Sequence, residues 1–110
     1  MERRKNYRVK TEIVLILDDN NEQAILKKAW ITDLGPKGAF IESQKLPEVG
    51  TRITLSFRLP GRLIKFKIPA IVRWISPSLA GFGVQFLGTE GNINKEVAQW
   101  IMNQYIKDVK

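Results

Sequence analysis

The strongest constraint on the fold is a two-residue alternation of apolar and polar side chains in the second half of the chain. Residues 52–59, 64–74 and 82–86 each place an apolar side chain at every second position. Successive side chains of a β-strand point to opposite faces of the sheet, so this alternation is typical of half-buried strands. The chain must therefore build a β-sheet that buries one face.

Three earlier segments also favour strands. Residues Val9–Leu17 are rich in β-branched side chains, and Glu22–Thr32 begins directly after a run of Asp and Asn that is typical of a turn. A short third segment, Gly38–Glu42, follows a loop that contains glycine and proline. With the alternating segments, these give six expected strands separated by turns.

The apolar period changes near the C-terminus. Apolar residues recur at helical spacing between Asn92 and Lys107, which predicts an amphipathic helix packed on the sheet rather than on a partner. The sequence thus predicts a mostly β fold, a six-stranded antiparallel β-barrel over residues 9–88 with a C-terminal α-helix over residues 92–107. At 110 residues, we expect residues 1–110 to form a single domain.

Composition argues against catalysis. The chain contains no cysteine and no histidine, and most acid–base machinery, thiol nucleophiles and zinc sites need one or the other. Its 11 acidic residues fall in no recognisable catalytic spacing. We therefore expect a protein that is not an enzyme and has no metal site, no catalytic residues and no cofactor.

The apolar segments are short. None approaches the roughly 20 residues that a membrane-spanning helix needs, and the charged N-terminus has no apolar segment behind it, unlike a signal peptide. Together with the absence of cysteine, this favours a cytoplasmic location. We expect no membrane partner.

The charge balance indicates an anionic partner. The formal net charge is +7, which suits a nucleotide, a nucleic acid or a membrane surface. The charge is concentrated near the N-terminus, where five cationic residues lie close together: Arg3, Arg4, Lys5, Arg8 and Lys10.

Three short motifs occur in order along the chain. Arg4 to Arg8 form an R-x-x-x-R, Asp33 to Gly38 read D-L-G-P-K-G, and Gly81 to Phe86 read G-F-G-V-Q-F. In their order and separations, and with the terminal helix, they resemble the PilZ domain family, whose second motif is D/N-x-S-x-x-G. The resemblance extends from about Arg3 to Tyr105.

The resemblance implies that the chain binds cyclic di-GMP as a signalling receptor and relays the signal to a protein partner. Arg4 and Arg8 take the two arginine positions of the family, and Asp33 and Gly38 hold the ends of the second motif. An arginine fork matches guanine O6 and N7 or phosphate oxygens, and a carboxylate can accept from the guanine N1 and N2 hydrogens. Residues 1–8 are then expected to be a flexible ligand-binding segment.

Two further residues belong to the predicted site. Arg3 precedes the R-x-x-x-R, which resembles the arrangement that accepts a stacked pair of ligand molecules. Trp74 ends the apolar face of its strand, which favours a position in the core. If Trp74 instead forms a platform on which a base stacks, it is a candidate ligand contact. Trp30 is expected in the core or barrel wall.

One residue departs from the family pattern. Gly35 stands where the second motif has serine, so the side-chain hydroxyl is missing. This leaves open a divergent PilZ domain that has lost the nucleotide and acts as a protein–protein adaptor. A small basic nucleic-acid-binding barrel is a weaker alternative. We expect a monomer, and the identity of the downstream partner stays open.

Overall fold

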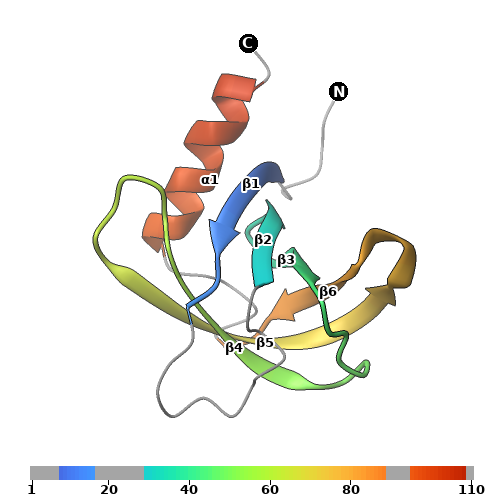
Figure 1. The fold of residues 1–110 in the computed structure, drawn as a ribbon. Coiled ribbons are helices and arrows are strands. Elements are labelled where there is room, and N and C mark those ends of the chain that lie inside the picture. The colour runs from blue at the N-terminus through green and yellow to red at the C-terminus, as the bar shows by residue number, and fades with distance from the viewer. Residues whose placement is uncertain (1–7, 17–28, 89–94, 109–110) are drawn as a thin grey trace.

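The computed structural model describes residues 8–16, 29–88 and 95–108, and it confirms the predicted fold class. Six antiparallel strands precede one α-helix (Figure 1). The elements are β1 (Val9–Val14), β2 (Ala29–Leu34), β3 (Gly38–Ser43), β4 (Arg52–Arg58), β5 (Lys65–Ser76), a 3-10 helix at Pro77–Leu79, β6 (Gly81–Phe86) and α1 (Lys95–Asp108).

Most predicted boundaries agree within three residues. The described part of β2 begins at Ala29, whereas the expected strand began at Glu22. Residues 22–28 lie outside the described part of the chain, as do residues 92–94 at the expected start of the helix.

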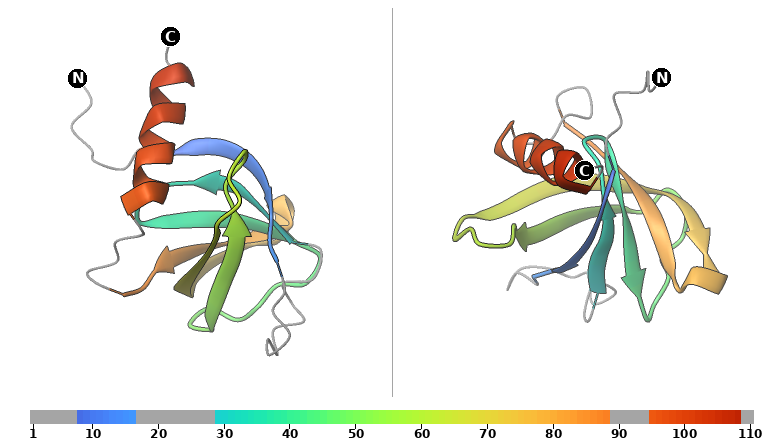
Figure 2. Two further views of the ribbon diagram at one scale, coloured as in Figure 1. Left: turned by 90° about the vertical axis from the view of Figure 1, so that its left-hand side faces the viewer. Right: turned by 90° about the horizontal axis from the view of Figure 1, so that it is seen from above.

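The six strands form one curled sheet in the order β1-β2-β3-β6-β5-β4. The curl brings the first and last strands of that order toward each other, as the view from above shows (Figure 2). There the Ile16 N–H, just after β1, donates a hydrogen bond of 2.7 Å to the carbonyl oxygen of Ser56 in β4. The result is a half-barrel with an inner apolar face and an outer face.

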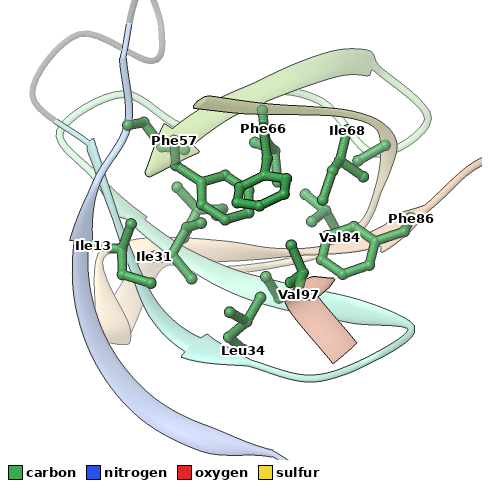
Figure 3. Packing of buried hydrophobic residues seen from close by; sticks show 14 of the residues in the cluster. Ile13, Ile31, Leu34, Phe57, Phe66, Ile68, Val84, Phe86 and Val97 are labelled. Atoms are coloured by element: carbon green, nitrogen blue, oxygen red, sulfur yellow. The ribbon is translucent and has the colours of Figure 1, made fainter. Parts of the chain in front are cut away.

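The inner face holds the hydrophobic core that the alternation predicts. Phe57, Phe82 and Phe86 are fully buried, and every strand also contributes buried aliphatic residues. Figure 3 shows part of this cluster. Val97 and Ile101 of α1 belong to the same cluster. The helix therefore packs against the sheet as expected.

The register between paired strands shifts at three places, and besides the shift between Lys10 and Ile13 of β1 two β-bulges change which face a side chain near the site occupies. Between Ile31 and Asp33 of β2, the register with β3 shifts by one residue. Between Val72 and Trp74 of β5, the register with β6 shifts in the same way. An inserted residue breaks the two-residue alternation, so the side chains beyond it turn to the other face.

The second bulge corrects the prediction that Trp74 lies in the core. Trp74 is 50% exposed on the outer face, while its neighbour Ile75 packs against the core instead. Trp30, also expected in the core or wall, is 39% exposed because it alternates with the buried Ala29 and Ile31.

Candidate functional site

The first bulge positions Asp33. Ile31 and Leu34 on either side are both fully buried, which a regular strand would not allow at a spacing of three residues. The extra residue lets both point inward and leaves the Asp33 carboxylate on the outer face, where its side chain is 23% exposed. Bulges are frequent beside functional sites because they re-aim side chains in this manner.

Two cationic side chains contact the Asp33 carboxylate: Arg8, which directly precedes β1, and Lys10 within β1. Arg8 donates from Nε to Asp33 Oδ1 at 2.8 Å, and Lys10 Nζ lies 3.5 Å from Oδ2. The structure therefore brings together Arg8 of the first motif and Asp33 of the second. Arg3 and Arg4 lie outside the described residues.

A continuous row of residues crosses the outer face of five strands. Lys10 is opposite Asp33, Asp33 opposite Phe40, Phe40 opposite Gly83, and Gly83 opposite Trp74. Neighbouring strands are about 4.8 Å apart, so the four steps extend over roughly 19 Å along the sheet. One end of the row is charged and the other is aromatic.

The aromatic end is a tilted pair of rings. The ring centroids of Phe40 and Trp74 are 5.2 Å apart with an interplanar angle of 31°. Both rings lie against glycines of β6: a Cβ at Gly83 would overlap the Trp74 indole, and one at Gly81 would overlap the Phe40 ring. The glycines of the third motif thus make room for an aromatic surface.

Between the two ends lies a cavity of about 520 Å³. Its lining combines cationic, acidic and apolar side chains: Arg8, Lys10, Thr32, Asp33, Ala39, Phe40, Glu42, Trp74, Leu79 and Val84. Such a site can take a ligand that has both planar rings and polar edges. The two cations and two carboxylates of the lining cancel, so attraction of a dianion depends on further cations.

Two predicted residues do not line this cavity. Gly35 donates from its N–H to the Gly38 carbonyl oxygen at 2.9 Å, which closes the turn before β3. A Cβ at Gly38 would collide with the backbone carbonyl oxygen of Val84 in β6. The motif glycine is therefore required for the close approach of β3 and β6.

The structure adds residues that the sequence did not single out for the site, chiefly Lys10, Phe40 and Glu42. Lys10 was noted only as part of the basic cluster, and its position two residues after Arg8 was an available signal. Phe40 and Glu42 gave no signal, because their place depends on which strands are neighbours.

The comparisons with known proteins show the family of the chain. The PilZ domain profile matches residues 2–103, so the chain belongs to the PilZ domain family. No curated protein matches the sequence.

Among solved structures, the chain is similar to the Bacillus subtilis inhibitor of motility (MotI/DgrA), with a TM-score of 0.63 and 16% sequence identity. The match covers 98% of this chain and 52% of that protein, so the chain spans about half of its length. At this identity the likeness supports the fold. Within the described residues, no helix is long and apolar enough to cross a membrane.

Proposed function

We propose that the chain is a cyclic di-GMP receptor that binds the nucleotide on the outer face of the half-barrel and passes the signal to a protein partner in the bacterial cytoplasm. The observation that carries this proposal is the cross-strand row from Lys10 to Trp74. It joins the Arg8–Asp33 pair of the two family motifs to an aromatic surface on one cavity.

The chemistry of the row suits a guanine dinucleotide. The Asp33 carboxylate can accept from guanine N1–H and N2–H, which guanine alone among the common bases presents together. The guanidinium of Arg8 can then turn to guanine O6 and N7 or to a phosphate, where charge-assisted bonds are strong. Phe40 and Trp74 offer ring faces for stacking.

The same geometry suggests how binding is signalled. Arg8 donates a hydrogen bond to Asp33 at 2.8 Å. A guanine that donates to Asp33 competes for that carboxylate and frees Arg8 for the ligand. Because Arg8 directly precedes β1, this exchange would change the surface beside β1, where a partner can detect it.

No catalytic step is part of this proposal. The cavity combines binding groups with a stacking surface, which suits a receptor. We further propose that the receptor needs no cofactor and acts as a monomer. The one observation that favours a different function is Gly35, which supports an adaptor that has lost the nucleotide.

Calorimetric titration with cyclic di-GMP, GTP and a short single-stranded oligonucleotide separates the three functions. We expect saturable binding of cyclic di-GMP and much weaker binding of GTP. Preference for the oligonucleotide with a steep salt dependence would instead indicate a nucleic-acid-binding barrel. Absence of binding to all three would support the adaptor.

Replacing Gly35 with serine tests the missing hydroxyl. The described glycines with positive φ are Gly50, Gly61 and Gly88, so Gly35 does not need a left-handed backbone. We expect Gly35→Ser to tighten cyclic di-GMP binding by about 0.5–1.5 kcal/mol, roughly two- to tenfold, which is the usual net worth of a hydrogen bond. Gly35→Ala is the matched control in calorimetry. Equal affinities of the serine and alanine variants would show that the hydroxyl has no role.

The stoichiometry depends on Arg3. Two stacked dinucleotides bring four negative charges together, and a third guanidinium offsets their repulsion. We expect two cyclic di-GMP molecules per domain in the wild type and a ratio that falls toward one in Arg3→Leu. Calorimetry measures both ratios, and a wild-type ratio of one would contradict the stacked pair.

A further inference from the structure

A second aromatic surface lies on the outer face of the sheet, over β1, β2 and β3, which run side by side (Figure 1). Trp30 of β2 is 39% exposed, and its cross-strand neighbours are Val14 of β1 and Glu42 of β3. Val14 is 57% exposed, and Glu42 is exposed as well. An accessible tryptophan beside another apolar side chain is a feature of surfaces that contact a protein partner.

The register shift in β1 brings a second carboxylate to this surface. Between Lys10 and Ile13, β1 has one residue more than the facing part of β2. Thr11 donates from Oγ1 to the Ile31 carbonyl oxygen at 2.6 Å, whereas the next residue, Glu12, is exposed. An extra residue re-aims the side chains around it. The shift therefore leaves the Glu12 carboxylate on the outer face beside β2.

Trp30 and the two glutamates line one cavity. Its volume is about 320 Å³, and its lining consists of Glu12, Trp30, Thr32 and Glu42. These residues offer one indole ring, two carboxylates and one hydroxyl. A cation is attracted both by the face of an aromatic ring and by carboxylates. The lining therefore suits a cationic group.

The charge of the two carboxylates is not compensated within the described part of the chain. There, no side-chain hydrogen bond or ion pair engages Glu12 or Glu42, and no other ring contacts Trp30. The two cations of the neighbouring nucleotide cavity pair with Asp33 instead. At physiological ionic strength, exposed charges farther away than about 8 Å are largely screened. The cavity thus presents negative charge on a chain whose net charge is +7.

We propose that this cavity binds an arginine side chain of the protein partner, with the guanidinium stacked on Trp30 and donating to Glu12 and Glu42. A guanidinium stacks on aromatic rings with its face and carries several donors for carboxylates at its edge. Quaternary ammonium ligands are typically enclosed by a cage of several aromatic rings, whereas a single ring lines this cavity. Among the residues that the structure describes, no group of three possible metal ligands occurs.

The identity of the partner rests on the proposed receptor function, and the position of the cavity suits that function. Thr32 and Glu42 line both this cavity and the nucleotide cavity. A partner held by Trp30 would therefore lie directly beside a bound nucleotide. This is the position that a relay from nucleotide to partner requires.

Titration of the isotope-labelled full chain with an arginine peptide, in the absence of nucleotide, tests the cavity. The probe is acetyl-Thr-Arg-Thr-Arg-Thr-amide, and the control peptide has uncharged citrulline in place of each arginine. We expect the arginine peptide to give saturable chemical-shift changes at the Trp30 indole N–H and at the Glu12 and Glu42 amides. The citrulline peptide should give none. Because no nucleotide is present, failure of this titration is distinguishable from failure of cyclic di-GMP binding.

Variants measure what each side chain contributes. Glu12→Gln and Glu42→Gln should each weaken binding of the arginine peptide about two- to fivefold, as expected for an exposed ion pair. Trp30→Leu should weaken it by a similar factor, about two- to fivefold, because the ring face is lost. The matched control is Glu48→Gln, which changes the net charge equally at an exposed position in the loop before β4 and should bind as the wild type does.

Several results would overturn the proposal. The first is an unshifted Trp30 indole with the arginine peptide, or equal shifts with both peptides. The second is wild-type affinity in both Glu12→Gln and Glu42→Gln, or an equal loss in Glu48→Gln. Tighter binding of choline than of the arginine peptide would assign the cavity to a small quaternary ammonium compound. Shifts of the same signals with protein concentration alone would assign it to a second copy of this chain.

Discussion

We expect Arg8→Ala to weaken cyclic di-GMP binding by about 1–3 kcal/mol, which is the range for a good bidentate arginine–guanine contact. Arg8 lies at the charged end of the cross-strand row and is already oriented by Asp33 at 2.8 Å. Arg4→Ala should have an effect of the same size, because the charges of the described lining residues cancel and the remaining attraction must come from the N-terminal cluster.

A matched control is available in the same chain. Arg62 is 43% exposed and pairs with Glu96 at 2.7 Å, and Arg8 is 44% exposed and pairs with Asp33 at 2.8 Å. Both are surface ion pairs whose net contribution to stability is about 0–1 kcal/mol. Calorimetry should therefore give wild-type affinity for Arg62→Ala and reduced affinity for Arg8→Ala. Wild-type affinity in both Arg4→Ala and Arg8→Ala would disprove the site.

The second large effect concerns folding stability. Gly38→Ala should lower the free energy of unfolding by about 1–3 kcal/mol, because the new Cβ meets the Val84 carbonyl oxygen in a strand paired on both sides. The backbone there cannot move aside without breaking the β3–β6 ladder. Urea denaturation followed by circular dichroism measures the change.

Gly83→Ala provides the comparison, since it makes the same chemical change in the same strand pair. There the three atoms nearest to the added Cβ all belong to the indole ring of the half-exposed Trp74, which can swing outward. We expect a smaller loss of stability but weaker cyclic di-GMP binding, because the aromatic end of the site is displaced. If Gly38→Ala proved no less stable than Gly83→Ala, the packing role of Gly38 would be refuted.

The strands and most of the core follow from local pattern alone. The alternation in β4 predicts the burial of Ile53, Leu55 and Phe57, and the helical period of α1 predicts the burial of Val97 and Ile101. Both patterns arise from the same requirement that one face of each element be removed from water. They extend over enough residues for the period to be read without knowledge of the neighbouring strands.

The bulges could not be predicted in this way. The alternation from Val72 to Trp74 is intact in the sequence, and the prediction of a core position for Trp74 was wrong because the register with β6 shifts there. The sequence pattern likewise does not indicate the bulge in β2 that turns Asp33 outward. A bulge depends on how two strands pair, so it leaves little trace in either strand alone.

The set of residues that forms the site also depends on how the strands pair. The row from Lys10 to Trp74 draws one residue from each of five strands, and β3 and β6 are neighbours although they lie far apart in the sequence. The resemblance to the PilZ family predicted that Arg8 and Asp33 belong to the site. The place of Phe40 in the site follows only from the strand order.

The most direct test of this account is the change in backbone amide and indole N–H chemical shifts when cyclic di-GMP is added to the labelled protein. We expect the largest shifts along the cross-strand row, at Arg8, Asp33, Phe40 and the Trp74 indole, with Leu63 at the tip of the β4–β5 hairpin unchanged. Saturating cyclic di-GMP that leaves the row unshifted, or that shifts residues only outside it, would contradict the proposal that this face of the sheet is the nucleotide site.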